Sequence, residues 1–220
     1  MKTITLKILI ICGLIAGPIF TLSWLIAGAT RKGYDPLRHP VSSLSIGSYG
    51  WTQITTFLLT GILLLGFSVA LIHISRFKSV STSGAILIAL CAIGLIGAAF
   101  FVSDPLSGYP MGQHTLPANR SVSGKLHDLF SSFFFLGFPF AAYKYCRYFL
   151  KFKNVSWAIY SFISIILFVC FFVFSSLGFG QIHGFVNFGG LFQRISISVV
   201  WCWMTLLAIQ MLKNEVGNIK

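Results

Sequence analysis

Residues 83–102 read SGAILIALCAIGLIGAAFFV, twenty consecutive positions without a charged side chain. A helix of this length rises about 30 Å, the thickness of the hydrocarbon core of a membrane. A helix also satisfies its own backbone hydrogen bonds in lipid, which a single strand cannot do. The stretch therefore predicts a transmembrane α-helix.

Five further stretches have the same apolar character and a similar length. The six expected spans cover residues 8–28, 53–75, 83–102, 124–145, 156–177 and 189–212. They fill most of the 220 residues and leave no segment long enough for a soluble domain. We therefore expect an all-α fold, an integral membrane bundle of six transmembrane helices that forms a single domain over residues 1–220.

The composition supports a membrane protein and argues against a nucleic-acid partner. Hydrophobic residues make up 56% of the chain and charged residues 9%, whereas about a quarter of the residues in soluble domains are charged. The formal net charge is +12, but the basic residues stand in short clusters between the apolar spans. Such clusters contact anionic lipid headgroups. We expect membrane lipids as partners and no nucleic acid, and the sequence identifies no protein partner.

The basic residues also predict an orientation. Ten of the sixteen flank one side of the expected membrane, and six flank the other. The ten are Lys2, Lys7, Arg76, Lys78, Lys144, Arg147, Lys151, Lys153, Lys213 and Lys220. Because cytoplasmic loops carry an excess of Lys and Arg, we expect both termini in the cytoplasm of a bacterial cell, with the protein in its cytoplasmic membrane.

Ionisable residues of another kind gather on the side predicted to be outer. Three of the four acidic residues and four of the five histidines lie in or beside the gaps on this side. They are Asp35, His39, Asp104, His114, His127, Asp128 and His183. Polar groups near membrane depth are costly and persist mainly where they are paired or functional. A candidate site is therefore expected at this face.

The gap after the first span offers groups for binding an anion. Arg31 and Arg38 could hold a phosphate or carboxylate, with His39 and Ser43 facing the same cavity. The alternative is a solvated loop in which Asp35 and Pro36 form a turn and a serine caps a helix. The residue types fit both interpretations.

The start of the fourth span places polar side chains inside the membrane. His127 and Asp128 lie about one turn below the rim, and Ser131 shares a helix face with His127. Asp128 points about 100° away from that face, so we expect it to pair with Arg194 of the sixth span, beside Gln193. An ion pair that only holds helices together would produce the same pattern.

A metal site is a further hypothesis. Imidazole and carboxylate are zinc ligands, and the expected donors are His39, Asp104, His114, His127 and His183. They come from separate segments, without an HExxH or CxxC motif to set their spacing. Asp104 also precedes Pro105, which is typical of a turn. Zinc is the cofactor that these residues permit, and they do not require it.

Several short motifs carry a resemblance to a known family. They are Gly33-Tyr34 to His39-Pro40 with Ser42-Ser43-Leu44, Ser103-Asp104-Pro105, Leu126-His127-Asp128, and Gly190-Leu191-Phe192-Gln193-Arg194 with Trp201. In this order, over nearly the whole chain, they resemble the DUF998 family of small multipass membrane proteins. The resemblance implies a six-helix membrane domain with motif residues at His39, Ser43, Asp104, His127, Gln193 and Arg194. It implies no reaction.

Three functions are compatible with these observations. The first is a protein that binds or moves an amphipathic anionic ligand, such as a lipid headgroup, in an outer-facing pocket. The expected pocket residues are Arg38, His39, Ser43, Asp104, His127, Asp128, Gln193 and Arg194. The second is a metal-dependent lipid hydrolase within the membrane, and the third is a structural or partner-binding subunit. No motif decides whether the chain is an enzyme.

The orientation is testable with reporter fusions. Fusions after Arg76 and after Lys151 should report the cytoplasm, and a fusion after Gly108 should report the opposite side, because the basic clusters remain inside. An external signal at Lys151 would overturn this topology and would move the candidate site to the other compartment.

Overall fold

The computed structural model describes residues 3–77, 80–113, 115–116 and 119–217. Over these residues the chain is helical, and an isolated bridge between Leu106 and Tyr109 is the one β-type pairing. The α-helices are α1 (Thr3–Thr30), α2 (Trp51–Ser75), α3 (Thr82–Phe100), α4 (Val122–Lys151), α5 (Val155–Phe179) and α6 (Gly189–Gly217). Two short 3₁₀ helices, η1 (Val41–Ser45) and η2 (Val186–Phe188), lie in the connections. The all-α prediction is confirmed.

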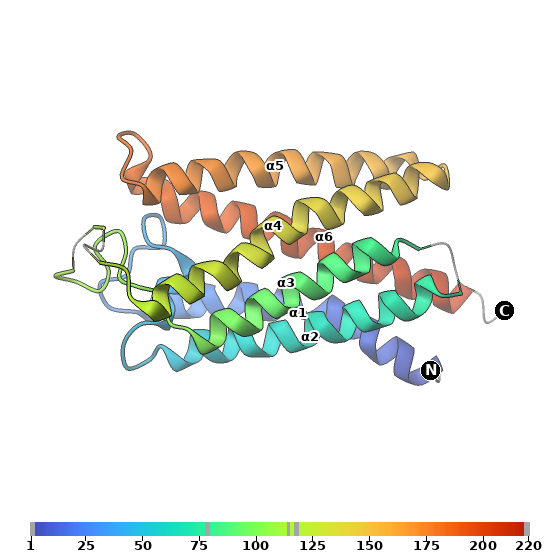
Figure 1. Cartoon of the computed structure of the whole chain (residues 1–220), viewed down its shortest axis with the longest axis horizontal. Helices are drawn as coiled ribbons and strands as arrows, with labels where there is room; N and C mark the ends of the chain where they lie inside the picture. The colour runs from blue at the N-terminus through green and yellow to red at the C-terminus, as the bar shows by residue number, and fades with distance from the viewer. Residues whose placement is uncertain (1–2, 78–79, 114, 117–118, 218–220) are drawn as a thin grey trace.

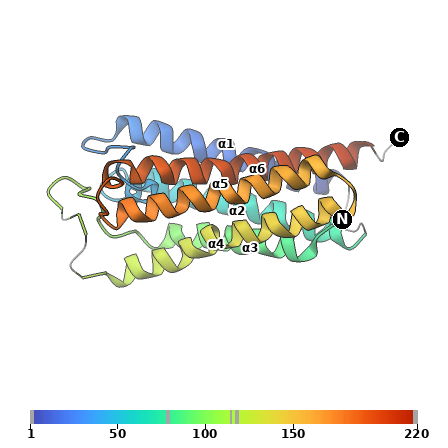
Figure 2. The same ribbon diagram turned by 90° about the horizontal axis from the view of Figure 1, so that it is seen from above.

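The six helices lie side by side along one axis (Figures 1 and 2). Consecutive helices pack against one another, and α6 packs against α1. Both chain termini lie at one end of the bundle, and the connections after α1, α3 and α5 lie at the other (Figure 1). We call this second end the distal end; it corresponds to the side predicted to be outer.

Five of the helices, α1, α2, α3, α5 and α6, are long and apolar enough to cross a membrane. Helix α4 has 30 residues but does not reach the same apolarity. The reason lies in its sequence, where His127 and Asp128 on one side and Lys144 on the other bound a short phenylalanine-rich run, residues 130–140. The sixth span stays a prediction, although α4 packs against both α3 and α5.

Side-chain caps place the starts of three helices. Ser81, Ser121 and Asn154 precede α3, α4 and α5, and each side chain accepts a hydrogen bond from a backbone N–H of the first turn. Such caps satisfy donors that have no partner within the helix. At α4 this cap fixes the level at which His127 and Asp128 enter the bundle.

Glycines bring α3 and α4 into close contact. A Cβ atom on Gly94 would lie 2.6 Å from the carbonyl oxygen of Phe130 and 2.9 Å from the backbone nitrogen of Phe134. Gly97 lies directly against the Phe130 ring. Small residues are typical of closely packed membrane helices, since they let the backbones approach. This contact holds the distal half of α4 against α3.

Replacing Gly94 with alanine should therefore destabilise the bundle. The new methyl group would meet backbone atoms that cannot rotate away, and overpacking of this kind costs about 1–3 kcal/mol. Gly66→Ala is the matched control, because its nearest neighbour is the end of the Leu9 side chain at 3.3 Å. Thermal unfolding in detergent should show a lower Tm for Gly94→Ala alone. Equal Tm values for the two variants would contradict the close contact.

Candidate functional site

A buried arginine fastens the first distal loop, residues 31–50, to α6. Arg194 is 6% exposed, and its Nη1 donates hydrogen bonds to the carbonyl oxygens of Pro36 (2.6 Å), His39 (3.0 Å) and Gly190 (3.0 Å). Its Nη2 donates to the hydroxyl of Tyr34. Arginine suits this position because its planar guanidinium presents several donors in fixed directions.

The sequence of α6 allows the loop to approach closely. A Cβ atom on Gly190 would lie 2.5 Å from the carbonyl oxygen of His39, so a larger residue there would push the loop away. One turn further along α6, the side-chain oxygen of Gln193 accepts a hydrogen bond from the backbone N–H of Val41 at 2.8 Å. These contacts place η1 across the distal end, where it packs against α1, α2 and α6.

His39 belongs to this loop structure. Its Nδ1 accepts a hydrogen bond from the backbone N–H of Asp35 at 2.8 Å, and its ring packs against Tyr34 and Tyr109. Burial lowers the pKa of His39, which favours the neutral ring that this hydrogen bond requires. Burial likewise raises the pKa of the Tyr34 phenol, so the hydroxyl beside Arg194 stays neutral.

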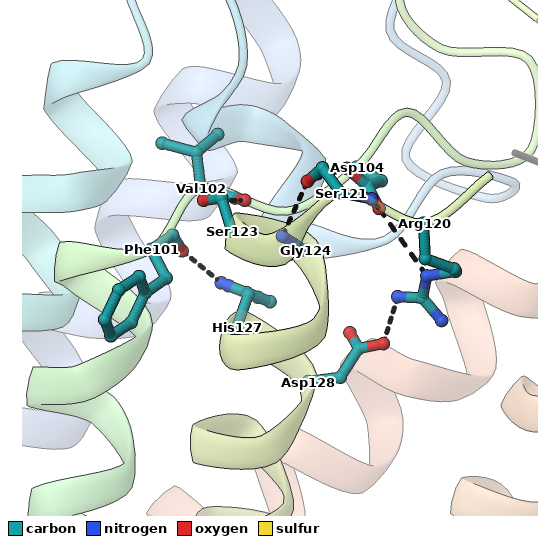
Figure 3. Close-up of polar contacts among 9 residues, drawn as sticks. All are labelled: Phe101, Val102, Asp104, Arg120, Ser121, Ser123, Gly124, His127 and Asp128. Carbon is teal, nitrogen blue, oxygen red and sulfur yellow. Dashed lines mark hydrogen bonds and ion pairs between the residues drawn. The ribbon is translucent and has the colours of Figure 1, made fainter.

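Asp128 pairs with Arg120, and the expected pair with Arg194 is wrong (Figure 3). Arg194 instead points toward α1, with its guanidinium carbon 5.1 Å from the centre of the Trp24 ring. Asp128 and Arg194 were expected to pair because they lie at similar depth along their helices. The direction in which each side chain leaves its helix matters as much, and it separates them. Arg120 precedes α4 and reaches both Asp128 and Asp104, whose carboxylate lies 3.5 Å from its Nε.

Asp104 and His127 tie the start of α4 to the end of α3 (Figure 3). The Asp104 carboxylate accepts hydrogen bonds from the backbone N–H and the hydroxyl of Ser121, at 3.0 and 2.6 Å. The buried His127 ring places Nδ1 2.7 Å from the carbonyl oxygen of Phe101. Because a carbonyl only accepts, Nδ1 carries the proton, and Nε2 is left as an acceptor.

A cavity of about 490 Å³ lies in the distal half of the bundle, with walls from both α4 and α5. Its polar lining residues are Ser42, His127, Asp128, Ser131, Ser132, Ser176 and Gln193. Most of the remaining wall is apolar. Where α4 and α5 meet, the rings of Phe135 and Phe172 stack with their centroids 4.9 Å apart. A smaller hollow of about 400 Å³ shares Ser42 and Asp128 with the cavity and includes Asp104 and Arg120.

The predicted pocket residues divide between the cavities and the loop. His127, Asp128 and Gln193 line the larger cavity, and Asp104 lines the smaller one. Arg38, His39, Ser43 and Arg194 are not among the lining residues of either cavity. The expectation that His39, Asp104 and His127 share one cavity is therefore not met.

Sequence reasoning missed the second wall of the cavity and one cation. Ser176 and Phe172 of α5 line the larger cavity, and Arg120 is the partner of both carboxylates. A serine pair within the last turns of a phenylalanine-rich span was a signal for the α5 wall. Arg120 carried no signal, since its partners depend on how the loop before α4 folds back.

The proposed zinc ligands do not come together in the part of the chain that the structure describes. Within it, no three His, Cys, Asp or Glu side chains form a group that could hold a metal ion. The Nδ1 of His39 and the carboxylate of Asp104 are engaged in hydrogen bonds, and His183 is exposed after α5. His114 lies outside the described residues.

Comparison with known proteins identifies one family. The family model described as "Protein of unknown function (DUF998)" matches residues 14–210, which include every residue of the cavities and of the Arg194 contacts. No curated protein and no solved structure matches the chain.

The two charged positions should differ in their effect on stability. Arg194→Met removes the donor to three carbonyls and a hydroxyl, and each buried polar group left without a partner costs about 1–3 kcal/mol. Asp128→Asn affects an ion pair in which each side chain is about half exposed, so we expect a loss of stability of about 0.5 kcal/mol or less. Arg147→Met, at an exposed position, is the control.

Thermal unfolding of the purified variants in detergent provides the measurement. The losses in the Arg194→Met, Asp128→Asn double variant should add, because the two side chains share no partner. Stability losses that differ strongly from the sum would indicate a direct Asp128–Arg194 pair and would contradict the structure.

Proposed function

We propose that this chain, which belongs to the DUF998 family, binds a single-chain amphipathic molecule that enters sideways from the membrane between α4 and α5. The family description assigns no function. The proposal therefore rests on the cavity, which combines an apolar wall with polar groups at its distal end. Sites for small ligands are usually mostly apolar, with a few polar groups and volumes of about 300–1,000 Å³.

We further propose that α4 is the sixth span and that both termini are cytoplasmic, in a bacterial cytoplasmic membrane. Five apolar helices and the packing of α4 between α3 and α5 support this arrangement. Both termini lie at the same end of the bundle, as an even number of spans requires (Figure 1). The cavity would then lie in the outer leaflet.

The exposure of the lining residues carries the proposed entry route. Leu136 of α4 lines the cavity and is 57% exposed, and Ser176 of α5 lines it and is also exposed. These two helices face each other across the cavity, and the stacked rings of Phe135 and Phe172 form part of its wall. A chain lying in the membrane could pass between Leu136 and Ser176 without leaving the apolar phase.

The polar groups favour a ligand with a hydrogen-bonding head. His127 offers Nε2 as an acceptor, and Ser131 lies one turn further along the same face of α4. Asp128 and Arg120 form an ion pair at the rim, where the two hollows meet. The hydroxyl head of a neutral ligand would lie among these groups while the chain lies against the phenylalanines.

The test is the binding of radiolabelled oleyl alcohol to purified protein in detergent. Ser176→Trp places an indole in the proposed entrance and should weaken binding about tenfold or more without lowering the Tm. Ile163→Trp is the control, because Ile163 is an exposed residue of α5 that does not line the cavity. Equal binding by the wild type and both variants would reject lateral entry, and a wild type that does not bind the probe would favour a purely structural subunit.

A further inference from the structure

Four buried side chains near η1 have polar atoms without a hydrogen-bond partner among the described residues. They are Nε1 of Trp24, Oγ of Ser43, both amide atoms of Gln53, and Nε of Arg194. Ser43 and Gln53 are completely buried, and Arg194 and Trp24 are 6% and 9% exposed. Buried polar atoms in folded proteins are almost always paired, so this group needs an explanation.

An aromatic layer lies on the cytoplasm-directed side of these atoms. The Phe20 ring packs against the rings of Phe57 and Trp201, with centroid-to-centroid distances of 5.9 and 5.3 Å. Trp24 follows Phe20 by one turn of α1, and Gln53 precedes Phe57 by one turn of α2. Because α1 and α2 run in opposite directions, both side chains lie one turn beyond the layer, toward the distal end.

The other two side chains close the region from the distal side. Ser43 belongs to η1, which packs against α1, α2 and α6. Arg194 reaches in from α6, where its guanidinium lies against the Trp24 ring and bonds the carbonyl of His39, just before η1. The unpaired atoms therefore lie between η1 and the aromatic layer.

Their chemistry is that of an anion site. Trp24 and Arg194 present N–H donors, Gln53 an amide NH₂, and Ser43 a hydroxyl, so donors outnumber acceptors. Arg194 also forms no ion pair with a carboxylate of the described residues; its partners are carbonyls and the Tyr34 hydroxyl. A buried positive charge surrounded by free donors is complementary to a carboxylate.

The large cavity ends beside this region, although none of the four side chains lines it. Phe20, Val41, Phe57 and Ile197 all line it. Each lies within two residues or one helical turn of one of the four side chains with unpaired atoms. A ligand that lies along the cavity would therefore point one end toward the donors.

We propose that Trp24, Ser43, Gln53 and Arg194 bind a carboxylate, whose charge balances Arg194. This inference rests on the proposed function in one respect: it takes the carboxylate to be the head of the chain held in the cavity. A free small carboxylate has the same chemistry and is the other source to be tested.

The experiment compares oleate, oleyl alcohol and acetate as probes of the full-length protein in detergent. Gln53→Leu and Trp24→Phe remove donors while keeping similar shapes. Each should weaken oleate binding about tenfold or more, as expected for a hydrogen bond to a charged group, and should leave oleyl alcohol binding unchanged. The matched controls are Gln210→Leu, near the opposite end of α6, and Trp51→Phe, which is 63% exposed.

A stability measurement separates binding from a structural role. Without any probe, Gln53→Leu should keep or raise the Tm, because it removes an unpaired buried amide. A lower Tm with unchanged oleate binding would show that Gln53 only supports the fold, and would overturn the proposal.

The remaining outcomes distinguish the two proposals. If acetate raises the Tm of the wild type but not that of Gln53→Leu, the anion site is supported. If oleyl alcohol does not bind in the same experiment, lateral entry is rejected while the anion site stands. Equal binding of oleate and oleyl alcohol, unaffected by Gln53→Leu and Trp24→Phe, would reject the carboxylate site and leave the cavity proposal intact.

Discussion

The distal end depends on the hydrogen bonds between Arg194 and the backbone of the first loop. A guanidinium at this depth must find acceptors within the protein, because lipid offers none. The carbonyls of Pro36, His39 and Gly190 supply them, and the loop must fold over α6 to do so. Together with the Gln193–Val41 hydrogen bond, these contacts position η1 over the distal end and hold His39 in its buried place.

The cavity arises from unequal packing on the two sides of α4. Gly94 and Gly97 hold the distal half of α4 against α3, at distances that no larger residue would allow. On the other side, bulky rings such as Phe135 and Phe172 make contact only further along the helices. The space between α4 and α5 is therefore a consequence of where glycine and phenylalanine stand on α4 and its neighbours.

The sequence predicts the fold well and the site in part. Uninterrupted apolar runs favour helices, so the all-α class and five of the long apolar helices follow from hydropathy alone. Depth along a helix also follows, and His127, Asp128 and Gln193, which we expected near the distal end, line a cavity there. Direction around the helix and the path of a loop do not follow, and these decided that Arg120 is the partner of Asp128 and that His39 packs against tyrosines.

Apart from the Tyr34 hydroxyl, Arg194 contacts the first loop through main-chain atoms and not through particular side chains. Its loop acceptors include two main-chain oxygens, which every residue type possesses, so substitutions at Pro36 or His39 need not remove them. The arginine itself, the Tyr34 hydroxyl and the small residue at Gly190 are chemically demanding. A loop held in this way can diverge in sequence between related proteins while keeping its shape, and so can change what its outward-facing side chains contact without disturbing the cavity beneath.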